Sequence, residues 1–261
     1  VPASKTAENQ QENGLTLEQL LSPGKKSPQM IAEFASSLTS IQNRAYQSIT
    51  SSEFFTTVGA VKSKEQPNIS ESVKLFNNIT NVVVQAILQN SSKNRTEMIK
   101  FFIDLQSQLI KNGDFQSAYA IQAALNNAAV DRLDEMKKLT GEYALALEKN
   151  SKLFNPSRNF ANLTAEIKER KSKGEFYLPL ISLALMQLTN ANEMPNPEDK
   201  TKVSPYKILQ FGTIIETACE SQSDKNKTME PPKHDVRDAL LSVNINPDDM
   251  YNRSLALQPR K

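Results

Sequence analysis

Apolar residues recur at intervals of three and four along almost the whole chain, and this spacing constrains the fold more than any other feature of the sequence. The stretch after Pro28, from Ile31 to Ile49, is one example. Such spacing puts the apolar side chains on one face of an α-helix, whereas a half-buried β-strand would alternate apolar and polar residues. Because that alternation is weak throughout, the sequence predicts an all-α fold.

Capping and breaking residues separate the periodic stretches. Ser27 before Pro28 is a suitable N-cap. Asn112-Gly113 is a strong stop, and Asp114 can cap the helix that follows. The sequence therefore predicts about nine helices in one bundle-like domain. They cover about residues 28–49, 70–90, 94–111, 115–125, 130–147, 157–167, 176–188, 205–220 and 236–241, with a final turn from Pro247.

Residues 176–188 are apolar nearly all round, which predicts a central, buried helix. Ser182 and Gln187 interrupt the run, and it is shorter than the roughly 20 apolar residues that span a bilayer. No transmembrane segment is therefore expected.

Residues 1–14 are polar and show no apolar periodicity, which predicts a disordered lead-in. The following residues, 15–261, are long enough to bury a substantial core and show neither an internal repeat nor a long heptad seam. They are therefore expected to form a single domain, and we expect it to be a monomer.

Charge and cysteine content exclude several classes of protein. The chain has 31 basic and 29 acidic residues and a net charge of +2. This balance predicts no electrostatic binding to nucleic acid or to an acidic membrane. The one cysteine, Cys219, allows no intrachain disulfide and is compatible with a reducing compartment. We therefore expect a cytoplasmic protein.

Residues suited to covalent chemistry are scarce. The single histidine, His234, lies in a tail rich in proline and lysine without a nucleophile motif, so we expect it to be an exposed loop residue. One cysteine and one histidine cannot form a Cys/His zinc site, and no glycine-rich phosphate loop occurs. No metal or cofactor is expected, and by elimination the domain is predicted to bind or act on another macromolecule.

The clearest functional signal lies between Arg95 and Asp134. It reads Arg95-Thr-Glu-Met98-Ile-Lys-Phe101-Phe-Ile103, then Asn112-Gly-Asp-Phe115-Gln-Ser117, then Ala124-Leu-Asn126 and finally Val130-Asp-Arg132-Leu133. This order resembles the core signature of the RasGEF family, the catalytic domain of guanine-nucleotide exchange factors for Ras-family GTPases. That signature has an arginine that opens a helix, an Asn-Asn-Phe-x-Ser turn, a Leu-Asn pair and Val-x-Arg-Leu.

Three further blocks occur in the order of the family. Residues 34–54 resemble its opening helix, residues 159–163 its Asn-Tyr motif, and residues 251–260 its closing Ser-Leu-x-x-Glu-Pro-Arg. The resemblance implies a multi-helix bundle with a projecting helical hairpin at about residues 185–223. It also implies a function without covalent chemistry, in which the hairpin promotes GDP release from a Ras-family small GTPase at its switch segment and magnesium site.

The resemblance also implies two groups of site residues. On the hairpin, Glu193 falls at the acidic position of the family, Thr189 at a leucine position, and Ser204 where the returning arm has asparagine. Glu198 or Asp199 could take the place of Glu193. The second group would bind the other switch segment of the GTPase and contains Phe76, Asn77, Tyr119, Asn126, Asp131, Asn159, Phe160 and Leu180.

Some positions depart from the family pattern. Asn77 replaces an arginine, Asp131 an aromatic residue, and Lys62 stands where tryptophan is common. Since aromatic residues and arginine usually anchor interfaces, an alternative function is a non-catalytic module that binds a GTPase or another protein on the same fold. Residues 1–27 are too few for the helical module that often precedes this domain. The Asn-, Gln- and Lys-rich, Trp-free composition is compatible with a bacterial effector that acts in the host cytosol.

Overall fold

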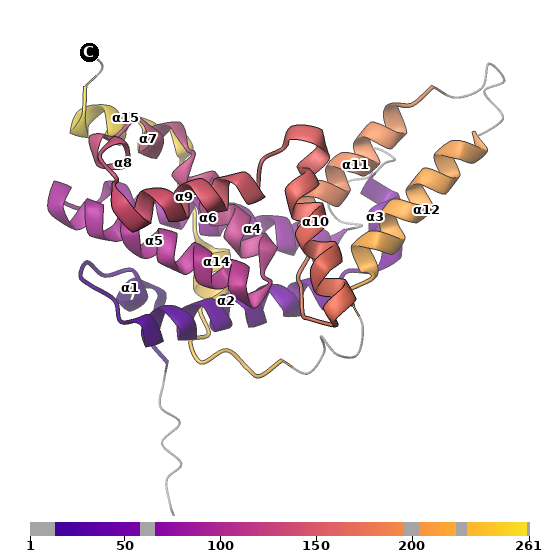
Figure 1. The fold of residues 1–261 in the computed structure, drawn as a ribbon, viewed down its shortest axis with the longest axis horizontal. Helices are drawn as coiled ribbons and strands as arrows, with labels where there is room; N and C mark the ends of the chain where they lie inside the picture. Colours follow the sequence, from indigo (N-terminus) through magenta and orange to yellow (C-terminus); the bar gives the residue numbers. More distant parts are fainter. Residues whose placement is uncertain (1–13, 58–65, 196–203, 223–228, 260–261) are drawn as a thin grey trace, which may run out of the picture.

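The computed structural model describes residues 14–57, 66–195, 204–222 and 229–259. Their regular structure is helical, and the one β contact among them is an isolated bridge between Asp114 and Leu178. Figure 1 shows a bundle of helices from which two arms, α11 (Ile181–Glu193) and α12 (Pro205–Cys219), project on one side. This arrangement confirms the predicted all-α fold. No helix of the described ranges is both long enough and apolar enough to cross a membrane.

The other helices form the bundle and its flanks. They are α1 (Leu17–Leu20), α2 (Pro28–Gln47), α3 (Ser51–Thr57), α4 (Pro67–Leu88), α5 (Ser92–Asn112), α6 (Phe115–Leu125), α7 (Ala128–Asp131), α8 (Asp134–Lys137), α9 (Gly141–Leu153), α10 (Ser157–Lys173), α14 (Arg237–Ser242) and α15 (Pro247–Leu257). The main core lies where α2, α4, α5 and α6 pack against one another.

The predicted helix limits are confirmed where capping is local. Ser27 Oγ accepts a hydrogen bond from the Met30 amide at 3.1 Å, and Pro28 is the first residue of α2. Helix α5 ends at Gly113, which has the left-handed conformation with φ of 80°. Asp114 then caps α6, because its Oδ1 accepts from the Ser117 amide at 2.8 Å.

The prediction of one buried central helix over residues 176–188 was wrong. The Leu178 amide donates to the Gly113 carbonyl at 2.8 Å, so this part of the run is extended and pairs with the end of α5. Only the part from Ile181 is helical, and it forms the projecting arm α11, where Met186 is 39% exposed.

Several boundaries also differ from the prediction. The stretch 130–147 is divided among α7, α8 and α9, while α3 and α15 are helices that were not predicted. Helix α4 begins at Pro67 rather than Ser70. Its start is stabilised from a distance, because Glu53 of α3 accepts hydrogen bonds from the amides of Asn68 and Ile69, both at 3.0 Å. A carboxylate at this end satisfies amides that have no partner within the helix.

The prediction that His234 is exposed was also wrong, since its exposed fraction is only 2%. Its Nδ1 accepts a hydrogen bond from the Leu15 amide at 3.1 Å, and its own amide donates to Ser37 Oγ at 3.1 Å. Burial lowers the pKa of this imidazole. His234 therefore joins its own segment after Pro232 to α2 and to the start of the described chain.

We expect Gly113→Ala to destabilise the domain far more than Gly141→Ala. Both glycines have positive φ, 80° and 62°. A Cβ at position 113 would lie 2.3 Å from the Phe176 carbonyl oxygen, whereas one at position 141 would meet nothing within 4 Å. Gly141→Ala should lower the free energy of unfolding only by the strain of an alanine in the left-handed conformation, about 1–2 kcal/mol. Gly113→Ala adds the steric overlap and should lower it by about 3 kcal/mol or more. Urea unfolding measures both, and equal losses would contradict the close approach.

We expect Asp114→Asn to stabilise the domain at neutral pH. Asp114 is fully buried, its Oδ2 has no hydrogen-bond partner, and burial raises its pKa from 3.8 to about 6 in spite of the hydrogen bonds from Ser117. A folded pKa above the unfolded value means that stability present below pH 3.8 is lost as the pH rises through about 6. Asparagine keeps the cap without this loss.

The advantage of Asp114→Asn should therefore be about 2–3 kcal/mol at pH 7.5 and should shrink toward pH 4. Paired urea titrations of the wild type and the variant in the same buffers measure the difference and cancel the contribution of other titrating groups. A difference that does not change with pH would contradict the assignment.

Candidate functional site

The two arms α11 and α12 lie side by side and are rooted in a small core of their own. Phe54 of α3, Leu188 of α11 and Ile215 of α12 are buried in it, apart from the main core. Each fully buried side chain of this size contributes about 1.5–3 kcal/mol. Helix α3, which follows α2, therefore braces both arms against the bundle.

Polar contacts fix both roots of the arms. At the start of α11, Gln116 Oε1 of α6 accepts from the Ile181 amide at 2.9 Å, which provides a cap from a neighbouring helix. At the end of α12, the Tyr46 hydroxyl donates to the Ala218 carbonyl at 2.7 Å and lies 2.7 Å from Ser221 Oγ. Tyr46 is 1% exposed, and burial raises the pKa of its hydroxyl.

The predicted hairpin residues lie near the free end of the arms. Thr189 and Glu193 are one turn apart on α11, and both are exposed. No hydrogen bond or ion pair of Glu193 occurs within the described residues, whereas Thr189 Oγ1 donates to the Leu185 carbonyl at 3.0 Å. Ser204 is the N-cap of α12 but forms no side-chain cap bond. The alternative acidic positions 198 and 199 lie outside the described residues.

Lys207, in the first turn of α12, was not predicted as a site residue. It is 6% exposed, and its Nζ donates to the carbonyl oxygen of Asn192 at 2.6 Å and of Met194 at 3.4 Å. These carbonyls flank Glu193 on the other arm. The only sign of this role in the sequence is a single lysine among the apolar residues of a predicted helix. That pattern does not show which group the lysine contacts.

Three residues of the second predicted group come together in an aromatic cluster around Tyr119. Its ring centroid lies 5.9 Å from that of Phe76 and 5.7 Å from that of Phe160. Phe154, which was not predicted, joins at 5.3 Å. Tyr119 is half-buried, and burial raises its pKa. Helices α4, α6, α9 and α10 thus contribute to one aromatic surface, in a range of separations that favours tilted ring contacts.

The other predicted members of this group lie in different environments. Asn77, Asn126, Asp131 and Asn159 are exposed, and Asn126 accepts a hydrogen bond from Gln122 at 3.0 Å. Leu180, by contrast, is 3% exposed and belongs to the main core. Asp131 ends α7, which packs against α15 at the end of the bundle away from the arms (Figure 1). Position 62 lies outside the described residues.

The backbone before Phe160 is unusual. Arg158, Asn159 and Phe160 have φ of 53°, 58° and 56°, so the start of α10 is a left-handed turn and not the regular helix that was predicted. Each non-glycine residue in this conformation costs roughly 1–2 kcal/mol, least for asparagine. Phe160 is 6% exposed and meets Tyr119 edge-on, so burial of its ring offsets part of this cost.

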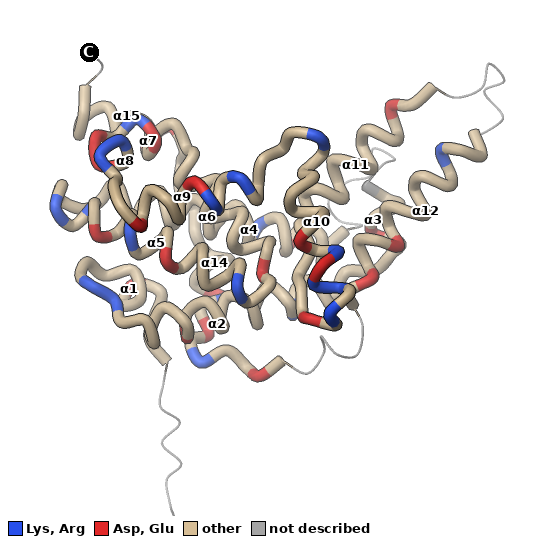
Figure 2. Tube along the Cα trace, viewed as in Figure 1, with Lys and Arg blue, Asp and Glu red and all other residues tan. Residues whose placement is uncertain are grey.

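Charge is sparse on the arms. Figure 2 shows mostly uncharged residues along α11 and α12, while charged residues gather on α10 and around the bundle. Within the bounds of these two helices the charged residues are Glu193, Lys207 and Glu216. In the described ranges no three His, Cys, Asp or Glu side chains are placed to hold a metal ion.

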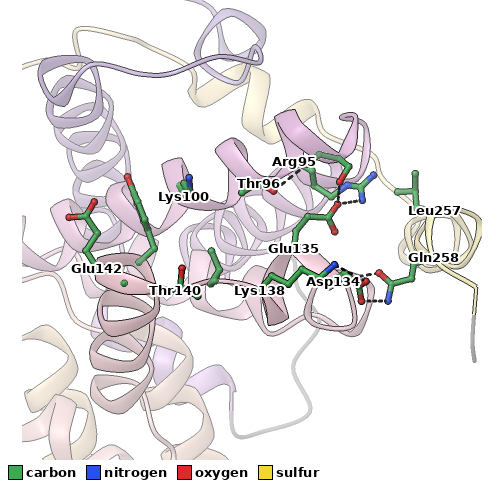
Figure 3. Close-up of a pocket in the computed structure, with 14 residues that line it drawn as sticks. Arg95, Thr96, Lys100, Asp134, Glu135, Lys138, Thr140, Glu142, Leu257 and Gln258 are labelled. Atoms are coloured by element: carbon green, nitrogen blue, oxygen red, sulfur yellow. Dashed lines mark hydrogen bonds and ion pairs between the residues drawn. The ribbon is translucent and has the colours of Figure 1, made fainter.

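A cavity of about 970 Å³ lies between α5, α8, α9 and the end of α15 (Figure 3). Part of its polar lining is paired internally: Arg95 and Glu135 form an ion pair at 2.8 Å, and Lys138 lies 3.3 Å from Asp134. None of the predicted site residues lines this cavity. The arms and the aromatic cluster are therefore the candidate functional site.

Comparison with known proteins agrees with this geometry. Residues 33–212 match the RasGEF domain family. The chain is 23% identical over 233 residues to Ras guanyl-releasing protein 3 of Homo sapiens, which covers 87% of this chain and 33% of that protein. It is 26% identical over 231 residues to Ras guanine nucleotide exchange factor D of Dictyostelium discoideum, covering 87% and 34%.

Ras guanine nucleotide exchange factor P of the same organism is 28% identical over 167 residues, which cover 62% of this chain and 11% of the relative. The chain thus spans about a third or less of the length of these relatives. The family match alone covers well over half of the 261 residues. With its ordered motifs, its helical bundle and its projecting arms, the chain belongs to the RasGEF family.

Proposed function

We propose that this chain promotes release of GDP from a Ras-family small GTPase. The observation that carries the proposal is the exposed pair Thr189 and Glu193, one turn apart at the free end of an arm that projects from a RasGEF domain. An arm that ends in an exposed carboxylate is suited to reach into a partner, and the relatives named above are exchange factors.

The exchange itself requires no covalent step. The GTPase holds its nucleotide with magnesium and with cationic and hydroxyl side chains around the phosphates. A carboxylate inserted there competes for the same cations. The exchange factor therefore weakens binding of the nucleotide, and the nucleotide weakens binding of the exchange factor by the same ratio. In this proposal Glu193 provides the carboxylate, while Thr189 and Ser204 line the end of the hairpin beside it.

The aromatic cluster is proposed to hold the second switch segment. Tyr119 and Phe76 are half-buried, so each presents part of a ring at the surface while the neighbouring rings keep it rigid. Preorganised aromatic residues are typical anchors of protein interfaces. The remaining part of each ring offers an apolar contact to the partner, and exposed Asn77 and Asn126 would surround it with polar groups.

The alternative, a binding module without exchange activity, is favoured by one observation. Positions 77 and 131, both in the predicted second group, carry exposed asparagine and aspartate in place of the arginine and aromatic residue typical of the family. Such a module would bind an empty or loaded GTPase without accelerating release. Action of a bacterial effector on a host GTPase stays a prediction from composition.

Release of a fluorescent guanine nucleotide from a panel of Ras-, Rap- and Ral-like GTPases tests the proposal. Acceleration of at least one by micromolar domain is the expected result. Binding without acceleration would select the non-catalytic module, and neither binding nor acceleration for any GTPase would refute both.

We expect Glu193→Ala to lower the maximal release rate about tenfold or more, since one charged contact made in the transition is worth about 1.5–3 kcal/mol. Glu193 is exposed at a helix end, so the fold and melting temperature should not change. Glu142→Ala, an exposed carboxylate at the start of α9, is the matched control. A rate equal to that of the wild type would remove Glu193 from the mechanism.

We expect Tyr119→Ala to weaken binding of the nucleotide-free GTPase about tenfold or more, the usual effect of truncating an aromatic anchor. Tyr119→Phe keeps the ring contacts with Phe76 and Phe160 and should retain most of the affinity. The measurement is the concentration of domain that gives half-maximal binding of the nucleotide-free GTPase. Thermal unfolding of both variants separates lost binding from lost stability, and equal affinity of the alanine variant and wild type would exclude the cluster from the interface.

A further inference from the structure

The end of α11 has no glycine cap. Its last helical residue is Glu193, and Met194 is extended, with φ of −60° and ψ of 140°, before Pro195. The last carbonyl groups of a helix have no partner within it and carry its partial negative charge. An exposed helix end of this kind frays unless other donors hold it.

Lys207 supplies such a donor from the other arm. Its neighbours Tyr206 and Ile208 are 60% and 58% exposed, whereas Lys207 is 6% exposed. The side chain is therefore turned inward between the arms, and its Nζ donates to the Asn192 and Met194 carbonyls. A buried ammonium group needs acceptors of this kind, and the negative end of a helix is a favourable place for a cation.

These two carbonyls lie on either side of Glu193. Donation to both fixes the backbone immediately before and after the residue and so fixes the direction in which its side chain leaves α11. Glu193 and Lys207 form no ion pair within the described residues, so the carboxylate stays exposed while its backbone is held.

We propose that Lys207 is a positioning residue that holds Glu193 in the orientation required for nucleotide release. The inference rests on the proposed exchange function, because it assigns the role of Lys207 through Glu193. The two charged residues then have different roles. Glu193 contacts the partner, and Lys207 keeps the end of α11 folded.

The first experiment tests the structural step in the domain alone. Hydrogen–deuterium exchange is compared for the wild type, Lys207→Met, which keeps a stem of similar shape without the charge, and Lys207→Arg, which keeps a cation. In Lys207→Met the amides of residues 189–194 should exchange about tenfold faster or more, as expected for a frayed helix end, while those of α5 should not change. Lys207→Arg should restore most of the protection. Lys137→Met, an exposed lysine of α8, is the matched control.

The second experiment tests whether the effect acts through Glu193. In nucleotide release, Lys207→Met should lower the maximal rate about fivefold or more and change the half-maximal concentration less than twofold, as expected for loss of an interaction made only in the transition state. In a Glu193→Ala background the same substitution should have no further effect, which a double-mutant cycle measures.

Each outcome decides a different claim. Unchanged amide exchange at residues 189–194 would overturn the role of Lys207 at the end of α11. Faster amide exchange with an unchanged release rate, or an equal loss of rate in the Glu193→Ala background, would overturn its action through Glu193. If the wild-type domain accelerates no GTPase, the proposed function fails, while the amide-exchange result still decides whether Lys207 holds the arm.

Discussion

The junction at Gly113 and Asp114 is the contact on which the rest of the structure depends. Helix α5 ends there in a left-handed glycine, α6 begins with a buried aspartate cap, and Leu178 pairs with the same two residues before α11. Arg170 of α10 also donates to the Ile110 carbonyl at 2.9 Å. Four helices are thus oriented around a segment two residues long. Because a side chain at position 113 would overlap the Phe176 carbonyl, only glycine allows this close approach.

The direction of the arms is set by this junction and by a second set of contacts. Gln116, two residues beyond the junction, caps α11, while Tyr46 of α2 holds the end of α12. The small core around Phe54 then fills the space between the arms and the bundle. Contacts at both roots and the small core between them therefore set the direction of the hairpin relative to the bundle. At the free end, Lys207 of α12 connects the two arms in a similar way, because its Nζ donates to the Asn192 and Met194 carbonyls.

Much of this structure was predictable from the sequence, and the reasons for the exceptions are physical. Ser27, Asn112-Gly113 and Asp114 act within a few residues of their own position, so the limits that they set were confirmed. The run 176–188 satisfies the pattern of a buried helix, but its first part pairs with Gly113, which is far away in the chain. His234 has the surroundings of a loop residue in the sequence, and it is buried because Leu15 and Ser37 provide its partners. Of the candidate site residues, the structure gathers Phe76, Tyr119 and Phe160, adds Phe154 and Lys207, and buries Leu180 in the core.

The sequence by itself determined the all-α class, most helix positions and the family, because helical hydrogen bonds and caps connect residues close together in the chain and because the motifs retain their order. Only the tertiary structure decided which apolar residues are buried, how the arms are rooted, and that the rings of α4, α6, α9 and α10 meet at Tyr119. The same holds for the contact of Lys207 with the carbonyls beside Glu193, since the two partners belong to different helices. Burial and long-range polar contacts depend on how separate helices pack, and no local pattern specifies that packing.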